Sequence, residues 1–368
     1  MTQDPSAENA GAGTVSLSRL PVTILTGYLG AGKTTLLNRI LSEDHGHRYA
    51  VIVNEFGEIG IDNDLIVNTD EELFEMNNGC ICCTVRGDLI RTLHALLAKD
   101  SNFDAIIIET TGLADPGPVV QTFFVDHVLQ ARTYLDSVTT LVDAKHILLR
   151  LADSREAVEQ IAFADQIVLN KTELVSEEEL AHIETRLAVI NSMATIHRAQ
   201  RANIALDKIL GRGRFDLERI VALEPDFLPA SQIAAEHVHD AHCGHEHDHQ
   251  HDHQHDHQHD HHHDHDIHSV SLSSHKPMDS ERISYWLNGL VASKGQDILR
   301  AKGIIDVRDD PRRLVFQAVH MLLEGDFQRP WSDGETRFSR LVFIGRRLDE
   351  AALRAGFESC IAHDEVLV

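Results

Sequence analysis

The chain has 368 residues, of which 42% are hydrophobic and 25% charged, a composition typical of soluble globular proteins. Its formal net charge of −25 argues against nucleic acid and against anionic membrane surfaces as partners, because both attract clustered Lys and Arg. No apolar run approaches the roughly 18 residues that can span a bilayer. The length exceeds that of one compact core, so we expect two domains and a tail.

The N-terminal segment, residues 1–19, is small and polar and contains the acidic Asp4 and Glu8. A signal peptide begins with basic residues and continues with an apolar run, so this segment is predicted to be a disordered leader. Five cysteines are an odd number, and three of them crowd into four residues. In a reducing compartment such a cluster favours metal binding or redox chemistry over disulfides, and the sequence predicts a cytoplasmic protein.

Residues 20–216 alternate apolar, β-branched runs with helical patterns, which is typical of βαβ units around a mostly parallel sheet. The near-continuous apolar character of these runs indicates strands that are covered by helices on both faces. The expected strands are Val22–Thr26, Ala50–Asn54, Ala105–Glu109, Val138–Asp143 and Gln166–Asn170. The expected helices are Thr34–Leu41, Leu89–Ala98 and Glu177–Ile190, the last with a capping box formed by Ser176 and Glu179. The sequence therefore predicts an α/β domain.

The first expected strand runs into a glycine-rich loop that matches the pattern GxxxxGK[ST], and a helical pattern follows at once. Glycines let the backbone turn sharply and bring its N–H groups against phosphate oxygens, and the helix N-terminus favours the anion. Lys33 should reach the β- and γ-phosphates, and the Thr34 hydroxyl should coordinate Mg²⁺. The nucleotide-binding residues of this loop are predicted to be Gly27, Gly30, Gly32, Lys33, Thr34 and Thr35.

A carboxylate is expected at the end of a later strand, where it can hold Mg²⁺ or its waters. Glu109 ends the strand Ala105–Glu109, and Gly112 follows it closely enough to approach the γ-phosphate. Asp143, at the end of the next strand, is a weaker candidate for the same neighbourhood. A catalytic role is therefore assigned to Glu109 together with Lys33.

The base is predicted from Asn170-Lys171-Thr172-Glu173, which ends the strand Gln166–Asn170. A carboxylate at Glu173 can accept two hydrogen bonds from the N1–H and N2–H₂ edge of guanine, a pair that adenine does not offer. Lys171 can lie over the base and Asn170 can brace the loop. A plain helix-capping loop is the alternative, and Glu in place of the usual Asp loosens the expected preference for GTP.

Three cysteines, Cys80, Cys82 and Cys83, follow Gly79 between the phosphate loop and Glu109. Thiolates are soft ligands that prefer metals such as Zn²⁺, and three of them leave one position of a tetrahedral site open. An open position is what a metal carrier needs, because the metal has to leave. A redox sensor is the alternative reading, and the isolated Cys360 is assigned to core packing.

Residues 217–267 are expected to be a linker, and from His237 to His275 the sequence changes character, because this stretch contains 17 of the 26 histidines. With no apolar residue to bury between His245 and Asp266, the histidine tract is predicted to be disordered, and it either buffers metal ions or only connects the domains. Residues 268–368 are expected to form a small α+β domain. Its expected strands are Ser269–Leu272, Leu314–Leu323 and Arg337–Phe343, and its expected helices are Ser280–Val291 and Asp349–Gly356.

Five segments together resemble the CobW family of GTPase metallochaperones, and within it the zinc-regulated GTPase metalloprotein activators. These segments are Gly27–Thr35, Asn54–Glu58, Gly79–Cys83, Glu109–Pro116 and Asn170–Glu173. The resemblance implies that the three clustered cysteines bind the metal and that the second segment is a nucleotide-responsive switch. It also implies transfer of zinc, cobalt or nickel to a client metalloenzyme.

The switch and the cysteines both lie between the phosphate loop and Glu109, so we hypothesise that GTP–Mg²⁺ orders the metal site and that hydrolysis relaxes it. Within the switch, Glu55 is assigned to the catalytic group, although Glu58 fits equally well as the residue that senses nucleotide or orients water. The expected function is a GTP-hydrolysing zinc chaperone. A Co²⁺ or Ni²⁺ chaperone and a non-catalytic zinc reservoir are the alternatives. The sequence does not determine the oligomeric state, and it allows a homodimer.

Overall fold

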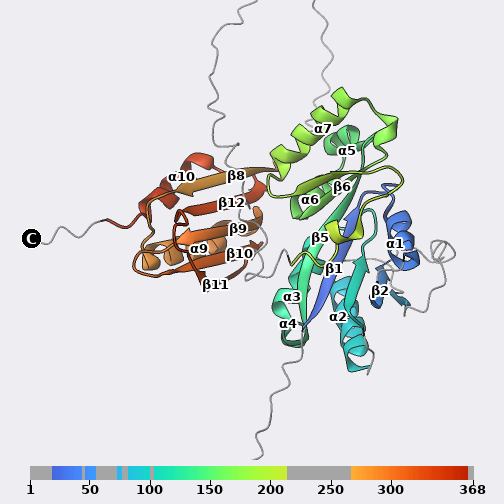
Figure 1. Cartoon of the computed structure of the whole chain (residues 1–368), viewed down its shortest axis with the longest axis horizontal. Helices are drawn as coiled ribbons and strands as arrows, with labels where there is room; N and C mark the ends of the chain where they lie inside the picture. The colour runs from blue at the N-terminus through green and yellow to red at the C-terminus, as the bar shows by residue number, and fades with distance from the viewer. Residues whose placement is uncertain are drawn as a thin grey trace, which may run out of the picture.

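The computed structural model describes residues 19–43, 46–54, 73–76, 82–99, 103–213 and 267–363. Figure 1 shows two folded parts side by side, which we call the N-terminal region (residues 19–213) and the C-terminal region (residues 267–363). The leader, the expected linker and the predicted boundaries at 216 and 267 fall largely on residues outside this description. The division of the chain at those positions therefore stays a prediction.

The N-terminal region is built on a seven-stranded sheet in the order β3-β2-β4-β1-β5-β6-β7, and all of its pairings are parallel. Its strands are β1 (Leu20–Gly27), β2 (Tyr49–Asn54), β3 (Leu73–Met76), β4 (Ala105–Glu109), β5 (Thr133–Asp143), β6 (Gln166–Asn170) and β7 (Thr195–Arg198). The helices are α1 (Lys33–Ser42), α2 (Cys82–Ala98), α3 (Gly117–Val125), α4 (His127–Arg132), α5 (Ile147–Asp153), α6 (Arg155–Phe163) and α7 (Glu177–Ile190). The α/β fold class is thereby confirmed.

Helices cover both faces of this sheet, which explains the continuous apolar runs of its strands. In β4, Ile106 and Ile108 face the core under α2, α3, α6 and α7, whereas Ile107 faces the core under α1. Successive strand residues point to opposite faces, so a strand that is buried on both sides needs apolar residues throughout. The predicted capping box at the start of α7 is also present.

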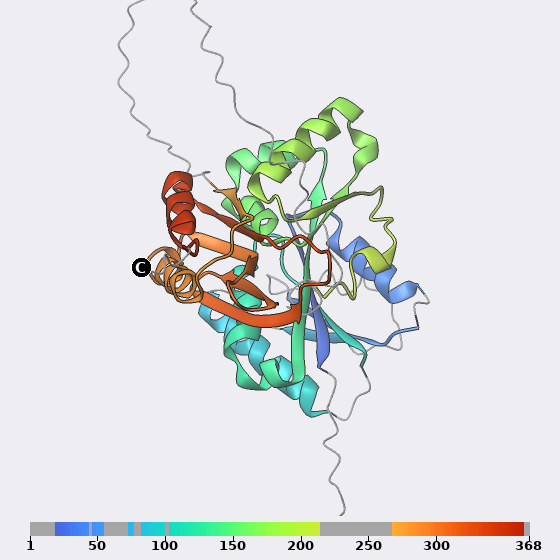
Figure 2. The same cartoon turned by 60° about the vertical axis from the view of Figure 1, so that its left-hand side comes forward.

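The C-terminal region is a five-stranded antiparallel sheet in the order β11-β10-β9-β12-β8. Its elements are β8 (Ile267–Ser274), α9 (Ser280–Lys294), β9 (Ile298–Asp306), β10 (Arg312–Val319), β11 (Leu322–Pro330), β12 (Ser339–Arg346) and α10 (Glu350–Ser359). Figure 2 shows α9 and α10 on the side of this sheet that is turned away from the N-terminal region. Cys360 is buried in the core beneath these helices, as expected.

Two sequence predictions for this sheet are wrong. The run Leu314–Leu323 forms two strands, because the chain reverses at His320 and Met321 and Val319 pairs with Leu322 across the turn. The central strand β9 was not predicted at all. Its Arg300 and Lys302 suggest a solvated segment, but every residue of β9 is buried.

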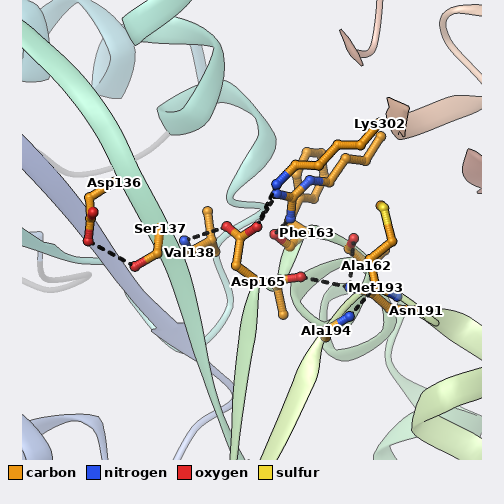
Figure 3. A network of polar contacts seen from close by, with 12 residues as sticks. Asp136, Ser137, Val138, Ala162, Phe163, Asp165, Asn191, Met193, Ala194 and Lys302 are labelled. Atoms are coloured by element: carbon orange, nitrogen blue, oxygen red, sulfur yellow. Dashed lines mark hydrogen bonds and ion pairs between the residues drawn. The ribbon is translucent and has the colours of Figure 1, made fainter. Parts of the chain in front are cut away.

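Arg300 and Lys302 of β9 are buried because they pair with Asp165, which immediately precedes β6. One oxygen of Asp165 accepts hydrogen bonds from Arg300 and from Lys302 at 2.9 Å, and the other accepts the backbone N–H of Val138 at 2.9 Å (Figure 3). Arg300 also donates to the backbone oxygen of Phe163 at 2.5 Å. One carboxylate thus joins β5, β6 and the C-terminal sheet.

Candidate nucleotide site

The glycine-rich loop lies between the end of β1 and the start of α1, at the edge of the sheet where the parallel strands end. Gly27, Gly30 and Gly32 have φ values of 140°, 73° and 108°, which side chains rarely allow. A Cβ on Gly27 would lie 2.3 Å from the backbone oxygen of Leu141. The loop therefore has the tight, main-chain-lined form that a phosphate group needs.

Lys33 is the first residue of α1, and its side chain folds back across the loop. Its Nζ donates to the backbone oxygen of Gly27 at 2.8 Å and contacts that of Tyr28 at 3.4 Å. Thr34 and Thr35 follow in the first turn of α1, and they are half-buried and exposed respectively. The loop thus combines a cation, two hydroxyls and a helix N-terminus, which suits a triphosphate with its Mg²⁺.

Glu109 ends β4 and lies next to the phosphate loop, because β4 pairs with β1 and Glu109 stands beside Leu25. Its side chain is buried, with 6% exposed. The following residue, Thr110, donates its hydroxyl to Thr26 at 2.8 Å and its backbone N–H to Leu25 at 2.9 Å. The end of β4 is therefore fixed to the strand that carries the phosphate loop.

Gly112 packs directly on the phosphate loop. A Cβ at this position would lie 2.6 to 2.8 Å from Cδ2, N and Cα of Leu29, so a larger residue would have to displace backbone. The sequence predicted an approach of Gly112 to the γ-phosphate. In the structure its near neighbour is the loop that is predicted to hold that phosphate.

Asn170 connects three segments of the site. Its Nδ2 donates to the backbone oxygen of Ala31 in the phosphate loop at 2.9 Å, and its Oδ1 accepts the N–H of Ala202 at 2.8 Å. Lys171 follows with a φ of 62°, and Glu173 is exposed on the short helix Thr172–Leu174. The predicted base loop therefore adjoins the phosphate loop, with one carboxylate open to solvent.

Asp143, the weaker sequence candidate for the neighbourhood of Mg²⁺, lies beside Lys171 of the predicted base loop. Its Oδ2 accepts a hydrogen bond from Lys171 at 2.6 Å and contacts Nδ1 of His146 at 3.0 Å. Burial raises the pKa of Asp143, but the bonds from Lys171 and His146 outweigh it and hold the pKa below its ordinary value. The carboxylate is thus ionised and already engaged by two side chains.

Gln160 on α6 is a residue of this site for which the sequence gave no signal. Its Nε2 donates to the backbone oxygens of Gly112 and Ala114, both at 3.1 Å. Next to it, a cavity of about 350 Å³ lies between α5, α6 and the phosphate-loop residues Tyr28 and Leu29. A glutamine in a helix without a motif cannot be recognised from sequence, because its partners are main-chain atoms of a distant loop.

The predicted metal site cannot be placed in full. Cys80, Glu55 and Glu58 lie outside the described residues, and of Cys82 and Cys83 the structure gives only the backbone, as the first two residues of α2. Within the part of the chain that the structure describes, no group of three or more His, Cys, Asp or Glu side chains could hold a metal ion. In that same part, no helix is long and apolar enough to cross a membrane.

Comparison with protein families matches both folded regions. Residues 21–198 match the model for the nucleotide-binding domain of CobW, HypB and UreG, and residues 267–361 match the C-terminal domain of the cobalamin synthesis protein CobW. The chain is 36% identical over 346 residues to the zinc chaperone YjiA of Escherichia coli, covering 93% of this chain and 98% of YjiA. It is 34% identical over 364 residues to zinc-regulated GTPase metalloprotein activator 1 of Schizosaccharomyces pombe, covering 90% and 84% of the two chains.

Solved structures agree with these sequence matches. The Zn(II)-bound crystal structure of the YjiA GTPase from Escherichia coli superimposes with a TM-score of 0.69 at 33% identity, over 94% of this chain and 99% of the other. A YjiA variant with one glutamate and two cysteines replaced by alanine, also Zn(II)-bound, gives a TM-score of 0.70 at 34% identity. The likeness therefore extends over both regions.

Proposed function

Because the chain belongs to the CobW family of nucleotide-binding proteins, we propose that it hydrolyses GTP and delivers zinc to client metalloproteins. One observation carries this proposal. The phosphate loop, Glu109 and the base loop Asn170–Glu173 meet at one edge of the sheet, in a chain whose near full-length relatives are named zinc chaperones and zinc-regulated GTPase activators.

Residues around the loop have distinct roles in the proposed hydrolysis. Lys33, whose ammonium bonds the loop oxygens of Gly27 and Tyr28, would exchange them for β- and γ-phosphate oxygens. Thr34 and Glu109 would hold Mg²⁺, which when bound neutralises phosphate charge. Glu55 would orient the attacking water, and this assignment rests on the sequence alone.

Guanine recognition is proposed for the loop that Asn170 anchors. Glu173 would accept both hydrogen bonds of the guanine edge, and the Lys171 stem would lie along the base. The contact of Lys171 with Asp143 supports this, since it limits the directions in which the stem can point. Ordering a long side chain in advance removes part of the entropy cost of binding.

Zinc is proposed as the cargo of Cys80, Cys82 and Cys83. α2 begins at Cys82, so the motif leads into the first turn of a 17-residue helix, where negative charge is favoured. Three thiolates leave a fourth position through which a client ligand can enter. We place the protein in the cytoplasm, where such thiols stay reduced, and leave its client unnamed.

GTP turnover is tested with Lys33→Ala in the full chain, with the exposed Lys208→Ala as the matched control. We expect kcat/KM for GTP to fall by about 10²-fold or more in Lys33→Ala, as when a donor to transition-state charge is removed. Lys208→Ala should match the wild type. A wild-type chain that releases no phosphate from GTP would indicate the zinc-reservoir alternative.

Zinc binding is tested by competition titration in the GDP state and with a non-hydrolysable GTP analogue. The triple variant Cys80→Ser/Cys82→Ser/Cys83→Ser should lose the tight equivalent and its dependence on nucleotide, whereas Cys360→Ala should keep both. The affinity for zinc has to be measured as well as the amount of bound zinc, since the YjiA variant without two of its cysteines was still Zn(II)-bound. Tighter binding of Co²⁺ or Ni²⁺ than of Zn²⁺ would change the proposed cargo.

A further inference from the structure

We propose that the C-terminal region positions the GTPase centre, acting through α6 on the loop 110–117, and that Arg346 and His320 are the positioning residues. The inference rests on the proposed GTPase function and adds a role for the second region. It follows from an unbroken series of contacts between the phosphate loop and the C-terminal sheet.

The series begins at the phosphate loop. The loop 110–117 starts with Thr110, which is bonded to β1, and continues with Gly112, whose Cα lies against Leu29. Gly112 has no room for a Cβ. A shift of this loop would therefore press on the phosphate loop, and a shift of the phosphate loop would press back.

α6 holds the same loop from the other side. Gln160, which is 1% exposed, donates to the backbone oxygens of Gly112 and Ala114. The backbone oxygen of Gln160 accepts the hydroxyl of Thr140 on β5 at 2.8 Å, so the helix is itself fixed to the sheet. The position of α6 thus sets the position of the loop.

The C-terminal sheet in turn holds α6. Glu159, the residue before Gln160, is 4% exposed and accepts hydrogen bonds from Arg155 at 2.8 Å and from Arg346 at the end of β12. At the end of α6, the backbone oxygen of Phe163 accepts a hydrogen bond from Arg300 of β9. Two central strands of the C-terminal sheet are therefore bonded to this one helix.

His320 makes a second, direct contact between the C-terminal region and the loop. It lies in the turn between β10 and β11, and its ring centroid is 5.7 Å from that of Phe163. A Cβ on Gly117 would lie 3.1 Å from Nε2 of His320 and 3.1 Å from Phe163. The turn is thus seated on the end of the loop, where α3 begins.

Arg346 is the residue on which the balance of charge between α6 and the loop 110–117 depends most. Burial and the neighbouring Glu159 raise the pKa of Asp115, a carboxyl of the loop, while Arg346 and Arg155 act in the opposite direction. The carboxyl of Asp115 also accepts the N–H of Gly117 at 2.8 Å. Without Arg346, only the exposed Arg155 would balance the buried Glu159 and the half-buried Asp115, so repulsion between the two carboxylates across the contact between α6 and the loop would increase.

The proposal is tested by GTPase kinetics of the full chain with Arg346→Ala, Arg346→Lys and His320→Gln. The exposed Arg354→Ala on α10 is the matched control. We expect Arg346→Ala to lower kcat about tenfold or more with KM for GTP changed less than about twofold, because misplacing the centre slows chemistry more than it weakens binding. His320→Gln should lower kcat in the same direction, Arg346→Lys should recover most of the loss, and Arg354→Ala should match the wild type.

A double-mutant cycle separates positioning from general destabilisation. Gln160→Ala and Arg346→Ala should each lower kcat, and the double variant should lose little more than the worse single variant, since both act along one route. Additive losses, or a folded Arg346→Ala protein with wild-type kcat, would overturn the inference. If Arg346→Ala does not fold, an unchanged kcat in His320→Gln overturns it. Absence of GTP turnover in the wild type would instead refute the proposed function.

Discussion

Replacing Asp165 by Asn should destabilise the whole chain, because this carboxylate balances two buried cations from the other region. The side chains of Asp165, Arg300 and Lys302 are 3%, 1% and 3% exposed. One oxygen of Asp165 serves both cations and the other accepts the N–H of Val138. Asn offers a single oxygen, so either the cations or the N–H group would face an NH₂ donor.

The expected loss in free energy of unfolding is about 3 to 5 kcal/mol, the cost of leaving a buried charge without its partner. That corresponds to a factor of roughly 10² to 5 × 10³ in the unfolding equilibrium. Urea unfolding at neutral pH should show it, with Glu177→Gln as control. Glu177 is 82% exposed in its pair with Arg198, so losing this pair should leave the free energy of unfolding almost unchanged.

The pH dependence gives a second measurement of the same effect. Burial raises the pKa of Asp165, but Arg300 and Lys302 outweigh it and hold the pKa below the ordinary 3.8. A carboxyl group whose pKa is lower in the folded than in the unfolded chain stabilises the folded state at pH values above the unfolded pKa. This stabilisation is lost as the pH falls through the pKa of the folded state. The free energy of unfolding of the wild type should therefore exceed that of Asp165→Asn by the full amount above about pH 5. The difference should become smaller as the pH falls toward about 3.

Two optical probes follow the two regions separately. Both tryptophans of the chain, Trp286 and Trp331, lie in the C-terminal region, so their fluorescence reports that region, while far-UV circular dichroism reports both. We expect the two transitions to coincide in the wild type and to separate in Asp165→Asn. A loss below about 1 kcal/mol at neutral pH would refute the reasoning, since it would equate the buried cluster with a surface pair.

Further predictions concern the nucleotide and metal sites. Gly112→Ala should lower the rate of phosphate release from GTP about tenfold or more, because its Cβ would displace Leu29, whereas Gly289→Ala, with open space around its Cα, should leave it unchanged. Asn170→Ala should weaken binding of fluorescent GDP and lower the free energy of unfolding by about 2 kcal/mol, and an unchanged affinity would contradict its bracing role. Deleting residues 245–263 should remove weak zinc equivalents in equilibrium dialysis and spare the tight one, and retention of all equivalents would reduce the histidine tract to a linker.

The parts of the fold that the sequence predicts are those written in local patterns. The phosphate loop and the strands beside it were recognisable because strand, glycine-rich turn and helix follow one another within a short stretch. The prediction of a single strand at Leu314–Leu323 was wrong, because a two-residue turn at His320 and Met321 interrupts this run and contains no glycine or proline. Strand β9 was not predicted, because its buried Arg300 and Lys302 are paired with Asp165, a carboxylate more than a hundred residues away in the sequence.

The candidate site divides in the same way. Glu109 and Asn170 end predicted strands and Lys33 immediately precedes a predicted helix, so their neighbourhood follows from the parallel sheet. Gln160 could not be assigned, because its partners are two main-chain oxygens of a distant loop. Asp143 was a candidate for the neighbourhood of Mg²⁺, but its contact with Lys171 could not be foreseen, because only the tertiary fold brings the two side chains together. The roles of all these residues in nucleotide chemistry stay predictions for the experiments above.

One hydrophobic core spans both regions, and this limits how the protein can be divided. Five side chains from four strands of the C-terminal sheet are buried together with side chains of α3, α6 and α7. The five are Ile267, Leu299, Val319, Val342 and Ile344. A fragment that stops before residue 267 would leave the apolar partners of these side chains in water, a surface prone to aggregation. Insolubility of such a fragment would therefore say nothing about whether the nucleotide site itself is competent.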